Sequence, residues 1–284
     1  MEKLVSAAWL SDHLDDAALV ILDASMHLPD AKRDARAEFA EGHIPGTRFL
    51  DLASLNDESD PAPKAVPSAE QLAARLSALG VEPSHRIVLY DDSAIRTSAR
   101  AWFVLNLYGI ESVAILDGGL AAWKADGGAM ESGEIDAVPS HFPASALARN
   151  DSMLRDKGDV RRNLTEKDEQ LVDARSKERF EANGADAVHG GQAGHIPGSR
   201  NLPFSSLFDE QGRYRDKDEL RRAFEQAGLD LSEPIITSCG SGVTASTLFF
   251  ALDRLGHDKV ALYDGSWLDW GSDPATPKET GPAR

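Results

Sequence analysis

Short apolar stretches alternate along this chain with longer stretches whose apolar residues recur at helical spacing. Leu19-Val-Ile-Leu-Asp-Ala24 and Arg86-Ile-Val-Leu-Tyr-Asp-Asp92 are of the first kind, which is typical of buried strands. Thr97 to Tyr108 is of the second kind, and Gly109 follows it as a helix stop. Strands that alternate with helices of this length predict a parallel sheet covered by helices, which is an α/β fold.

The same series of patterns occurs twice. In both halves a strand-like run is followed by a Gly-His-Ile-Pro-Gly loop, by a capping box that predicts a helix ended by a glycine, and by two further strands. The paired segments are Leu19–Ala24 and Gln170–Arg175, Gly42–Arg48 and Gly194–Arg200, Ser68 to Gly80 and Asp216 to Gly228, Arg86–Asp92 and Pro234–Gly240, and Val113–Gly119 with Trp123 and Val260–Ser266 with Trp267. The chain is therefore a tandem duplication.

This duplication predicts two similar domains, each a parallel sheet covered by helices. We place the first at residues 1–124 and the second at residues 163–284. Residues 125–162 have no regular counterpart and carry several glycines and prolines, so we interpret them as a linker.

Composition excludes several classes of partner. The 284 residues carry a formal net charge of −17, which argues against binding to nucleic acid or to anionic membranes. No apolar stretch approaches the roughly 20 residues needed to cross a bilayer, and no signal-peptide core is present, so we expect a cytoplasmic protein. The single cysteine allows neither an internal disulfide nor a thiolate-rich metal site. We predict no cofactor, and we expect small molecules or other proteins as partners.

The only cysteine, Cys239, lies where the pattern changes from strand to helix. Ile235 and Ile236 are typical of a short buried strand, and apolar residues at helical spacing run from Thr244 to Leu255, before Gly256. The cysteine is therefore expected on a strand-to-helix turn.

Glycines in this turn predict a cradle for an anion around the sulfur. Gly240 and Gly242 allow successive backbone N–H groups to converge, and the following helix adds the positive end of its dipole. A thiol in such a place is expected to be largely ionised, and the thiolate is the nucleophilic form. The alternative is that Cys239 is a small buried core residue. The flanking Gly-Ser-Gly segment favours the cradle.

Only the second half carries this arrangement. Alignment of the strands places Asp91 at the position of Cys239, and the segment Asp92-Ser-Ala-Ile-Arg96 has no glycine with which to build a cradle. One site is therefore expected, in the second domain. Because pockets favour domain interfaces, we expect the first domain to cover that site and to supply supporting groups.

Together these motifs resemble those of the two-domain rhodanese-type sulfurtransferases. The resemblance rests on the repeated Gly-His-Ile-Pro-Gly motif, on the loop Cys239-Gly-Ser-Gly-Val-Thr244 in the second half only, and on Tyr263-Asp-Gly-Ser-Trp267. Within the family the loop looks like the 3-mercaptopyruvate sulfurtransferase version. Thiosulfate-preferring members carry basic residues directly after the cysteine, where this chain has Gly240 and Ser241. Thiosulfate sulfurtransferase is kept as the alternative.

The resemblance implies that Cys239 takes up a sulfur atom from the donor as a persulfide. The backbone N–H groups expected to hold the charged persulfide are those of Gly240, Ser241, Gly242, Val243 and Thr244. Because the chain has no second cysteine, an external acceptor is required. We expect cyanide, a small thiol or a reduced thioredoxin-like protein in that role.

The resemblance also suggests residues for donor binding and proton transfer. Arg179 matches the carboxylate-binding arginine of the family, and a guanidinium suits an α-keto carboxylate; its alternative is a solvated surface arginine. A second arginine that some members carry is absent here, where His189 is the nearest cation. Ser241, His43 and Asp34 match a set proposed to move a proton between donor and leaving group.

His43 and Asp34 have structural interpretations as well. His43 recurs as His195 in the same motif of the other half. A histidine that fixes the loop before the proline in both halves would explain this recurrence. Asp34 lies in the charge-rich segment Lys32-Arg-Asp-Ala-Arg36, which is typical of a solvated face. At this point both interpretations are open.

Two other functions compete with sulfur transfer. Rhodanese-like folds resemble a class of cysteine phosphatases, but those place an arginine six residues after the cysteine, where this chain has Ala245. Their loop is also one residue longer, which suits a tetrahedral phosphate. A non-catalytic binding module, which the first domain alone would resemble, is disfavoured by the intact loop at Cys239.

Overall fold

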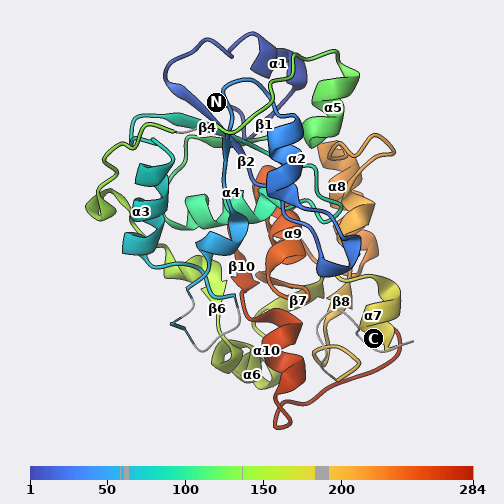
Figure 1. The fold of residues 1–284 in the computed structure, drawn as a ribbon. Helices are drawn as coiled ribbons and strands as arrows, with labels where there is room; N and C mark the ends of the chain where they lie inside the picture. The colour runs from blue at the N-terminus through green and yellow to red at the C-terminus, as the bar shows by residue number, and fades with distance from the viewer. Residues whose placement is uncertain (58, 61–63, 136, 183–191, 284) are drawn as a thin grey trace. The chain divides into compact units, whose positions relative to one another are not determined.

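The computed structural model describes residues 1–57, 59–60, 64–135, 137–182 and 192–283 (Figure 1). The chain divides into two compact units. Of the described residues, the first unit holds 1–57, 66–135, 137–150 and 210–214, and the second holds 59–60, 64–65, 151–182, 192–209 and 215–283. No helix among the described residues is long and apolar enough to cross a membrane.

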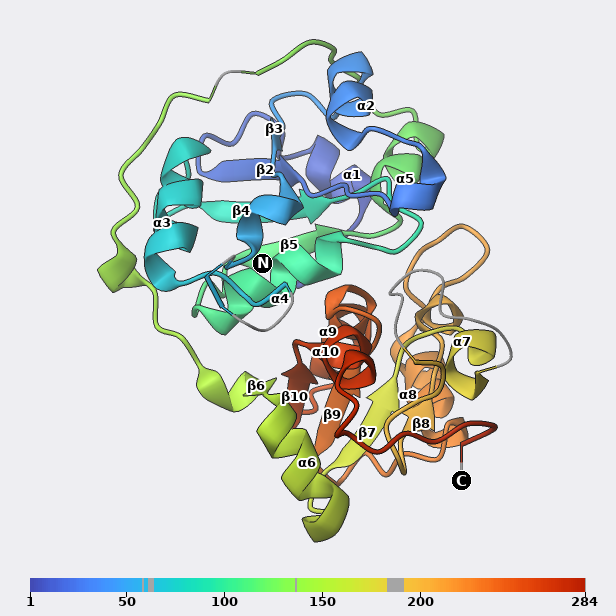
Figure 2. The ribbon, with the colours of Figure 1, turned by 60° about the horizontal axis from the view of Figure 1, so that its bottom comes forward.

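The first unit is built on a five-stranded parallel sheet with the strand order β1-β5-β4-β2-β3. Its strands are β1 (Leu4–Val5), β2 (Leu19–Asp23), β3 (Arg48–Phe49), β4 (Arg86–Tyr90) and β5 (Val113–Leu116). Its helices are α1 (Ala7–Ser11), α2 (Ala35–Glu41), α3 (Ala69–Ala78), α4 (Ser98–Leu107) and α5 (Gly119–Ala125). Helices α1 and α5 pack on one face of the sheet and α4 on the other, so the central strands are buried on both sides (Figure 2).

The second unit repeats this plan, with the strand order β6-β10-β9-β7-β8. Its strands are β6 (Leu154–Arg155), β7 (Gln170–Asp173), β8 (Arg200–Asn201), β9 (Ile235–Ser238) and β10 (Val260–Tyr263). Its helices are α6 (Lys157–Glu166), α7 (Lys177–Glu181), α8 (Lys217–Gln226), α9 (Val243–Arg254) and α10 (Ser266–Ser272). The predicted fold class, two α/β units each with a parallel sheet, is confirmed.

Strand register fixes which residues of the two units correspond. Asp23 of β2 lies opposite Tyr90 of β4, and Asp173 of β7 lies opposite Ser238 of β9. The residue that follows β4 is therefore equivalent to the residue that follows β9. Asp91 and Cys239 occupy the same place in the two sheets.

Helix boundaries follow the sequence signals closely. Ser68 with Gln71 and Asp216 with Glu219 form reciprocal capping boxes at the starts of α3 and α8. Each of these helices ends two residues before its predicted glycine, which has a positive φ. Glycine adopts this left-handed conformation without strain, whereas a residue with a side chain does not.

Residues 125–162, which the sequence pattern indicates as a linker, divide between the two units. Residues 126–150 belong to the first unit, where the buried side chain of Phe142 joins its core. Residues 151–162 belong to the second unit, where β6 pairs with β10 as a strand of the sheet and α6 begins at Lys157. With only two residues, β6 is too short to produce a recognisable pattern.

The tryptophan that corresponds to Trp123 is Trp270, so the predicted pairing with Trp267 is wrong. Trp123 and Trp270 both donate from indole Nε1 to a backbone carbonyl later in the chain, at 2.7 and 2.8 Å. Trp267 instead corresponds to Leu120, because Leu120 donates its backbone N–H to the carbonyl of Asp91 and Trp267 donates its own to the carbonyl of the equivalent Cys239. Two indoles three residues apart left this alignment ambiguous in the sequence.

Candidate active site

Cys239 lies in the turn that joins β9 to α9. Strand β9 ends at Ser238, and Gly242 takes the left-handed conformation, with φ of 79°, directly before α9 begins at Val243. Glycine adopts that φ without strain, which allows so short a turn. Cys239 is 2% exposed.

Several backbone N–H groups of this turn have no acceptor among the described residues. They include those of Gly240, Ser241, Val243 and Thr244. Val243 and Thr244 open a helix of 12 residues, and the first N–H groups of a helix have no partner within it. The helix dipole also favours negative charge at this end. The turn can therefore bind an anion next to Cys239.

Helix α10 holds the turn from one side. The N–H of Trp267 donates to the carbonyl of Cys239 at 3.0 Å, and the N–H of Leu268 donates to the carbonyl of Gly240 at 2.8 Å. In a trans peptide the N–H points opposite to the carbonyl. The N–H groups of Gly240 and Ser241 therefore both point away from α10, which aligns them for one ligand.

A buried ion pair, which we did not include among the predicted site residues, supports the same turn. The Arg175 side chain is 0% exposed, and its Nε and Nη2 atoms lie 2.9 and 2.7 Å from Oδ2 of Asp173. The guanidinium carbon lies 4.6 Å from the ring centroid of Trp267, the residue that holds the Cys239 carbonyl. The sequence signal was the change from Ser25 in the first half to Arg175 in the second.

Ser241 and Arg179 lie in the same unit as Cys239. Ser241 is 7% exposed and sits in the turn itself. Arg179 is half-buried on α7, which follows β7, the parallel neighbour of β9. Segments that follow neighbouring parallel strands lie at the same edge of a sheet, where ligands of α/β proteins bind. Their roles stay predictions, and His189 lies outside the described residues.

His43 and His195 make the same contacts in the two units. The ring of His43 stacks on Phe39, with centroids 4.0 Å apart, and its Nδ1 lies 2.7 Å from the Phe39 carbonyl oxygen. His195 stacks on the equivalent phenylalanine at 3.8 Å and bonds its carbonyl at 2.9 Å. Both backbones form a β-bridge, to Glu131 and Glu279 respectively. Because both units share these contacts although only the second carries a nucleophile, the contacts support the structural interpretation of His43.

Asp34 is the N-cap residue of α2. Its carboxylate accepts the N–H groups of Arg36 and Ala37 at 3.0 and 3.1 Å, and the residue is exposed. Satisfying the first N–H groups of a helix is the ordinary role of aspartate at this position. Asp34 and His43 therefore flank the two ends of α2, and both have a structural explanation.

The paired histidines allow a matched test. We expect His43→Ala and His195→Ala to lower the free energy of unfolding by similar amounts, about 1–3 kcal/mol, because each removes a stacked ring and a buried hydrogen bond. Urea unfolding measures this loss. The kcat of folded His43→Ala is expected to match wild type. A large loss of kcat in His43→Ala with unchanged stability would instead assign that histidine to proton transfer.

In the first unit the equivalent turn holds a carboxyl group of its own. Oδ1 of Asp91 accepts the N–H of Ser93 at 2.9 Å, and Oδ2 accepts the N–H of Ser98, the first residue of α4, at 2.8 Å. Burial raises the pKa of Asp91, while these N–H groups oppose that shift. Asp91, which stands at the position of Cys239, thus accepts the N–H groups that would otherwise be available to an external anion.

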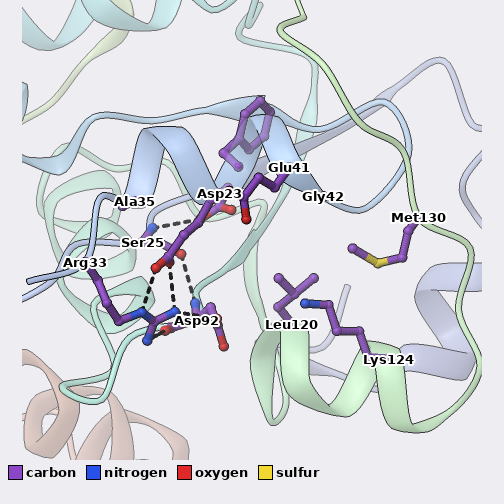
Figure 3. A pocket seen from close by; sticks show the side chains of 12 residues that line it. Asp23, Ser25, Arg33, Ala35, Glu41, Gly42, Asp92, Leu120, Lys124 and Met130 are labelled. Carbon is purple, nitrogen blue, oxygen red and sulfur yellow. Dashed lines mark hydrogen bonds and ion pairs between the residues drawn. The ribbon is translucent and has the colours of Figure 1, made fainter. Parts of the chain in front are cut away.

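A cavity of about 430 Å³ lies next to this turn in the first unit. Figure 3 shows Arg33 and Asp92 on one side of it and Lys124 across from them. The Arg33 guanidinium binds both Glu38, at 2.7 and 2.8 Å, and Asp92, at 2.8 Å. Glu38 occupies the position of Arg179, because each precedes the phenylalanine that stacks on a histidine. The charge at this position is therefore reversed between the two units.

Asp23 lines the same cavity, and its ionisation makes the stability of the first unit depend on pH. Burial raises the pKa of Asp23 to about 6, so the proton is bound more tightly in the folded than in the unfolded state. The contribution of Asp23 to the free energy of unfolding is fully present below about pH 4, where the carboxyl group is protonated, and it is lost as the pH rises through about 6. Asp23→Asn keeps an oxygen for the Ser25 N–H, which donates at 2.8 Å. It is expected to raise the free energy of unfolding by about 2–3 kcal/mol at pH 7.5.

Urea unfolding at pH 7.5 and pH 4.5 checks this expectation, because the advantage of Asp23→Asn should shrink at the lower pH. Asp173→Asn is the matched control in the second unit. It removes the charge that pairs with buried Arg175, so it is expected to destabilise at pH 7.5. An Asp23→Asn protein less stable than wild type at both pH values would contradict the account of Asp23.

The chain thus consists of two α/β units, each with a parallel sheet. Only the second unit carries a cysteine nucleophile, so the fold and the site define a tandem α/β protein that performs cysteine chemistry. The model of the rhodanese-like domain matches residues 6–126 and 156–273. The chain belongs to the rhodanese-like family.

Relatives that match almost the whole chain are sulfurtransferases. The 3-mercaptopyruvate sulfurtransferase of Escherichia coli K12 is 38% identical over 276 residues, which cover 97% of each chain. The mitochondrial thiosulfate/3-mercaptopyruvate sulfurtransferase 1 of Arabidopsis thaliana is 36% identical over 98% of this chain and 78% of its own. The crystal structure of SseA from Escherichia coli superposes with a TM-score of 0.85 at 37% identity, over 94% of this chain and 99% of that one. The predicted resemblance is confirmed, and the chain is a sulfurtransferase.

Proposed function

We propose that this enzyme transfers a sulfur atom from 3-mercaptopyruvate to a thiol or cyanide through a persulfide on Cys239. The observation that carries the proposal is the set of N–H groups around the only cysteine, at the start of α9, that have no acceptor within the part of the chain that the structure describes. Such groups are placed to stabilise negative charge that moves from the cysteine sulfur to the transferred sulfur.

The first half-reaction forms the persulfide. The Cys239 thiolate attacks the sulfur of mercaptopyruvate, an S–S bond forms, and the C–S bond of the donor breaks. The electron pair of that bond leaves on the enolate of pyruvate, which takes up a proton. This proton is the one that the thiol group of the donor gives up. We assign its relay to the enolate to the Ser241 hydroxyl, two residues from the sulfur, and the binding of the donor carboxylate to Arg179. His43 and Asp34 are assigned structural roles.

The second half-reaction returns the cysteine. An acceptor thiolate, or cyanide, attacks the outer sulfur of the persulfide, and the Cys239 thiolate leaves. The products are an acceptor persulfide or thiocyanate. Because the chain has one cysteine, the acceptor comes from outside, and a reduced thioredoxin-like protein is the macromolecular candidate. A protein that depends on one free thiol suits a reducing compartment, so we assign it to the cytoplasm.

The donor assignment rests on charge near the sulfur. Gly240 and Ser241 bring no cation to the turn, whereas a dianion such as thiosulfate would need one to offset its desolvation. We therefore expect kcat/KM for 3-mercaptopyruvate to exceed that for thiosulfate by at least about tenfold, a difference of about 1.4 kcal/mol in transition-state stabilisation. Steady-state kinetics with both donors and a common acceptor measure this ratio.

Arg179→Ala provides the control for the donor assignment. It is expected to raise KM for mercaptopyruvate with little change in kcat, because the carboxylate contact is made in the ground state and the transition state alike. A clear advantage for thiosulfate in the wild-type enzyme would overturn the donor assignment and leave sulfur transfer itself in place.

A further inference from the structure

We propose that Ser266 is the positioning residue of the nucleophile turn and that its hydroxyl, rather than its backbone, sets the rate of persulfide formation. This inference rests on the proposed function of Cys239. Ser266 is the first residue of α10 and is 0% exposed. Its hydroxyl lies within the turn described above.

The Ser266 hydroxyl joins both ends of the turn. Its Oγ accepts the N–H of Cys239 at 3.1 Å and the N–H of Gly242 at 3.2 Å, and it donates to the carbonyl of Tyr263 at 2.8 Å. One donor and two acceptor positions are the full capacity of a serine hydroxyl. The hydroxyl is therefore held in one orientation, and it draws two N–H groups that flank Gly240 and Ser241 to a single point.

The backbone of Ser266 is in a conformation that serine rarely adopts. Its φ is 50°, in the left-handed region. The equivalent residue of the first unit is Gly119, with φ of 58°, because Gly119 precedes Leu120 as Ser266 precedes Trp267. The backbone conformation at this position therefore favours glycine, and the second unit carries serine there despite the strain. Strain of this kind persists where it serves a site.

The two units show why only one of them uses a hydroxyl here. A Cβ atom on Gly119 would lie 2.2 Å from the carbonyl oxygen of Asp91, so the first unit has no room for a side chain. Its turn is ordered by the Asp91 carboxyl group, which accepts the N–H groups of Ser93 and Ser98. In the second unit, Cys239 has to keep its sulfur available for the donor. There the Ser266 side chain, which lies outside the turn, accepts the backbone N–H groups that order the turn.

This arrangement sorts the N–H groups of the turn into two sets. Those of Cys239 and Gly242 bind Ser266, while those of Gly240 and Ser241 point away from α10, because the carbonyls on their peptide groups bind that helix. Without the hydroxyl, the N–H groups of Cys239 and Gly242 lose their acceptor, and the turn is free to rotate them toward the sulfur. The set that stabilises the persulfide would then no longer be fixed before reaction.

Ser266→Gly separates the hydroxyl from the backbone. Glycine fits the left-handed φ, as Gly119 does in the first unit, so the variant is expected to fold, with relief of backbone strain offsetting part of the stability lost with the three hydrogen bonds of the hydroxyl. Rapid mixing with 3-mercaptopyruvate, followed by quenching and mass analysis of Cys239, measures the rate of persulfide formation. We expect a fall of about 10- to 100-fold, somewhat less than for direct loss of a charge-stabilising donor, with KM for the donor nearly unchanged.

Two further variants complete the test. Ser266→Ala also lacks the hydroxyl but keeps the strain, so it is expected to be as slow as Ser266→Gly and less stable. Ser272→Ala is the control on the same helix. Among the described residues the Ser272 hydroxyl bonds the carbonyls of Leu268 and Asp269, both in α10, so this variant is expected to react like wild type. Wild-type rates in Ser266→Gly would overturn the inference while the proposed function stood. A wild-type enzyme that forms no persulfide would remove both.

Discussion

Replacing Cys239 by serine is expected to abolish sulfur transfer, lowering kcat by at least about 10⁴-fold, as removal of a nucleophile does in other enzymes. A serine hydroxyl is close in size to the thiol but is not ionised at neutral pH, and an oxygen cannot carry the transferred sulfur in the same way. Steady-state turnover with 3-mercaptopyruvate and cyanide, followed as thiocyanate, measures the loss.

The Cys239→Ser protein is also expected to fold, because the substitution changes one buried atom in a turn that is fixed by backbone hydrogen bonds. Circular dichroism and urea unfolding provide that control. With no other cysteine in the chain, residual turnover within about tenfold of wild type could not come from a second thiol, and it would contradict the assignment of Cys239.

Arg175→Ala is expected to have the largest effect on stability, a loss of about 3–5 kcal/mol in the free energy of unfolding. The side chains of Arg175 and Asp173 are 0% and 3% exposed, so removing the guanidinium leaves a buried carboxylate without its partner. The same change removes the cation that lies against Trp267, which holds the Cys239 carbonyl. We therefore expect kcat to fall in the fraction that remains folded. Urea unfolding and turnover at 25 °C measure both effects.

Arg162→Ala is the matched control in the same unit. Arg162 is 62% exposed and pairs with Asp159 on the surface of α6, and such pairs contribute about 0–1 kcal/mol. An Arg175→Ala protein no less stable than Arg162→Ala would show that the buried pair contributes little to the fold of the second unit.

Much of the fold could be predicted from the sequence because its signals are local. The capping box of Ser68 and Gln71 and the glycine stops lie within single helices, and the strand-like runs survived duplication with their order intact. Duplication also located the nucleophile, because Asp91 stands where the other half has Cys239. Strand β6, with two residues, was hidden inside the predicted linker because so short a strand carries no periodicity.

The supporting groups of the site could not be predicted, because they depend on contacts between distant segments. Ser266 reaches the turn only through the register of β10 on β9, and no spacing along the chain encodes that contact. The same holds for Arg175 against Trp267. His43 shows the reverse case, since a residue type that suggested proton transfer makes the same structural contacts as its counterpart His195.

The central claim is that Cys239 itself carries the sulfur between donor and acceptor. The most direct test is the mass of the intact protein, and of its Cys239 peptide, after incubation with 3-mercaptopyruvate and removal of the donor. The account predicts the addition of one sulfur atom, located on Cys239 and lost again on addition of cyanide. An unmodified Cys239 in protein that still turns over, or sulfur found at any other residue, would contradict it.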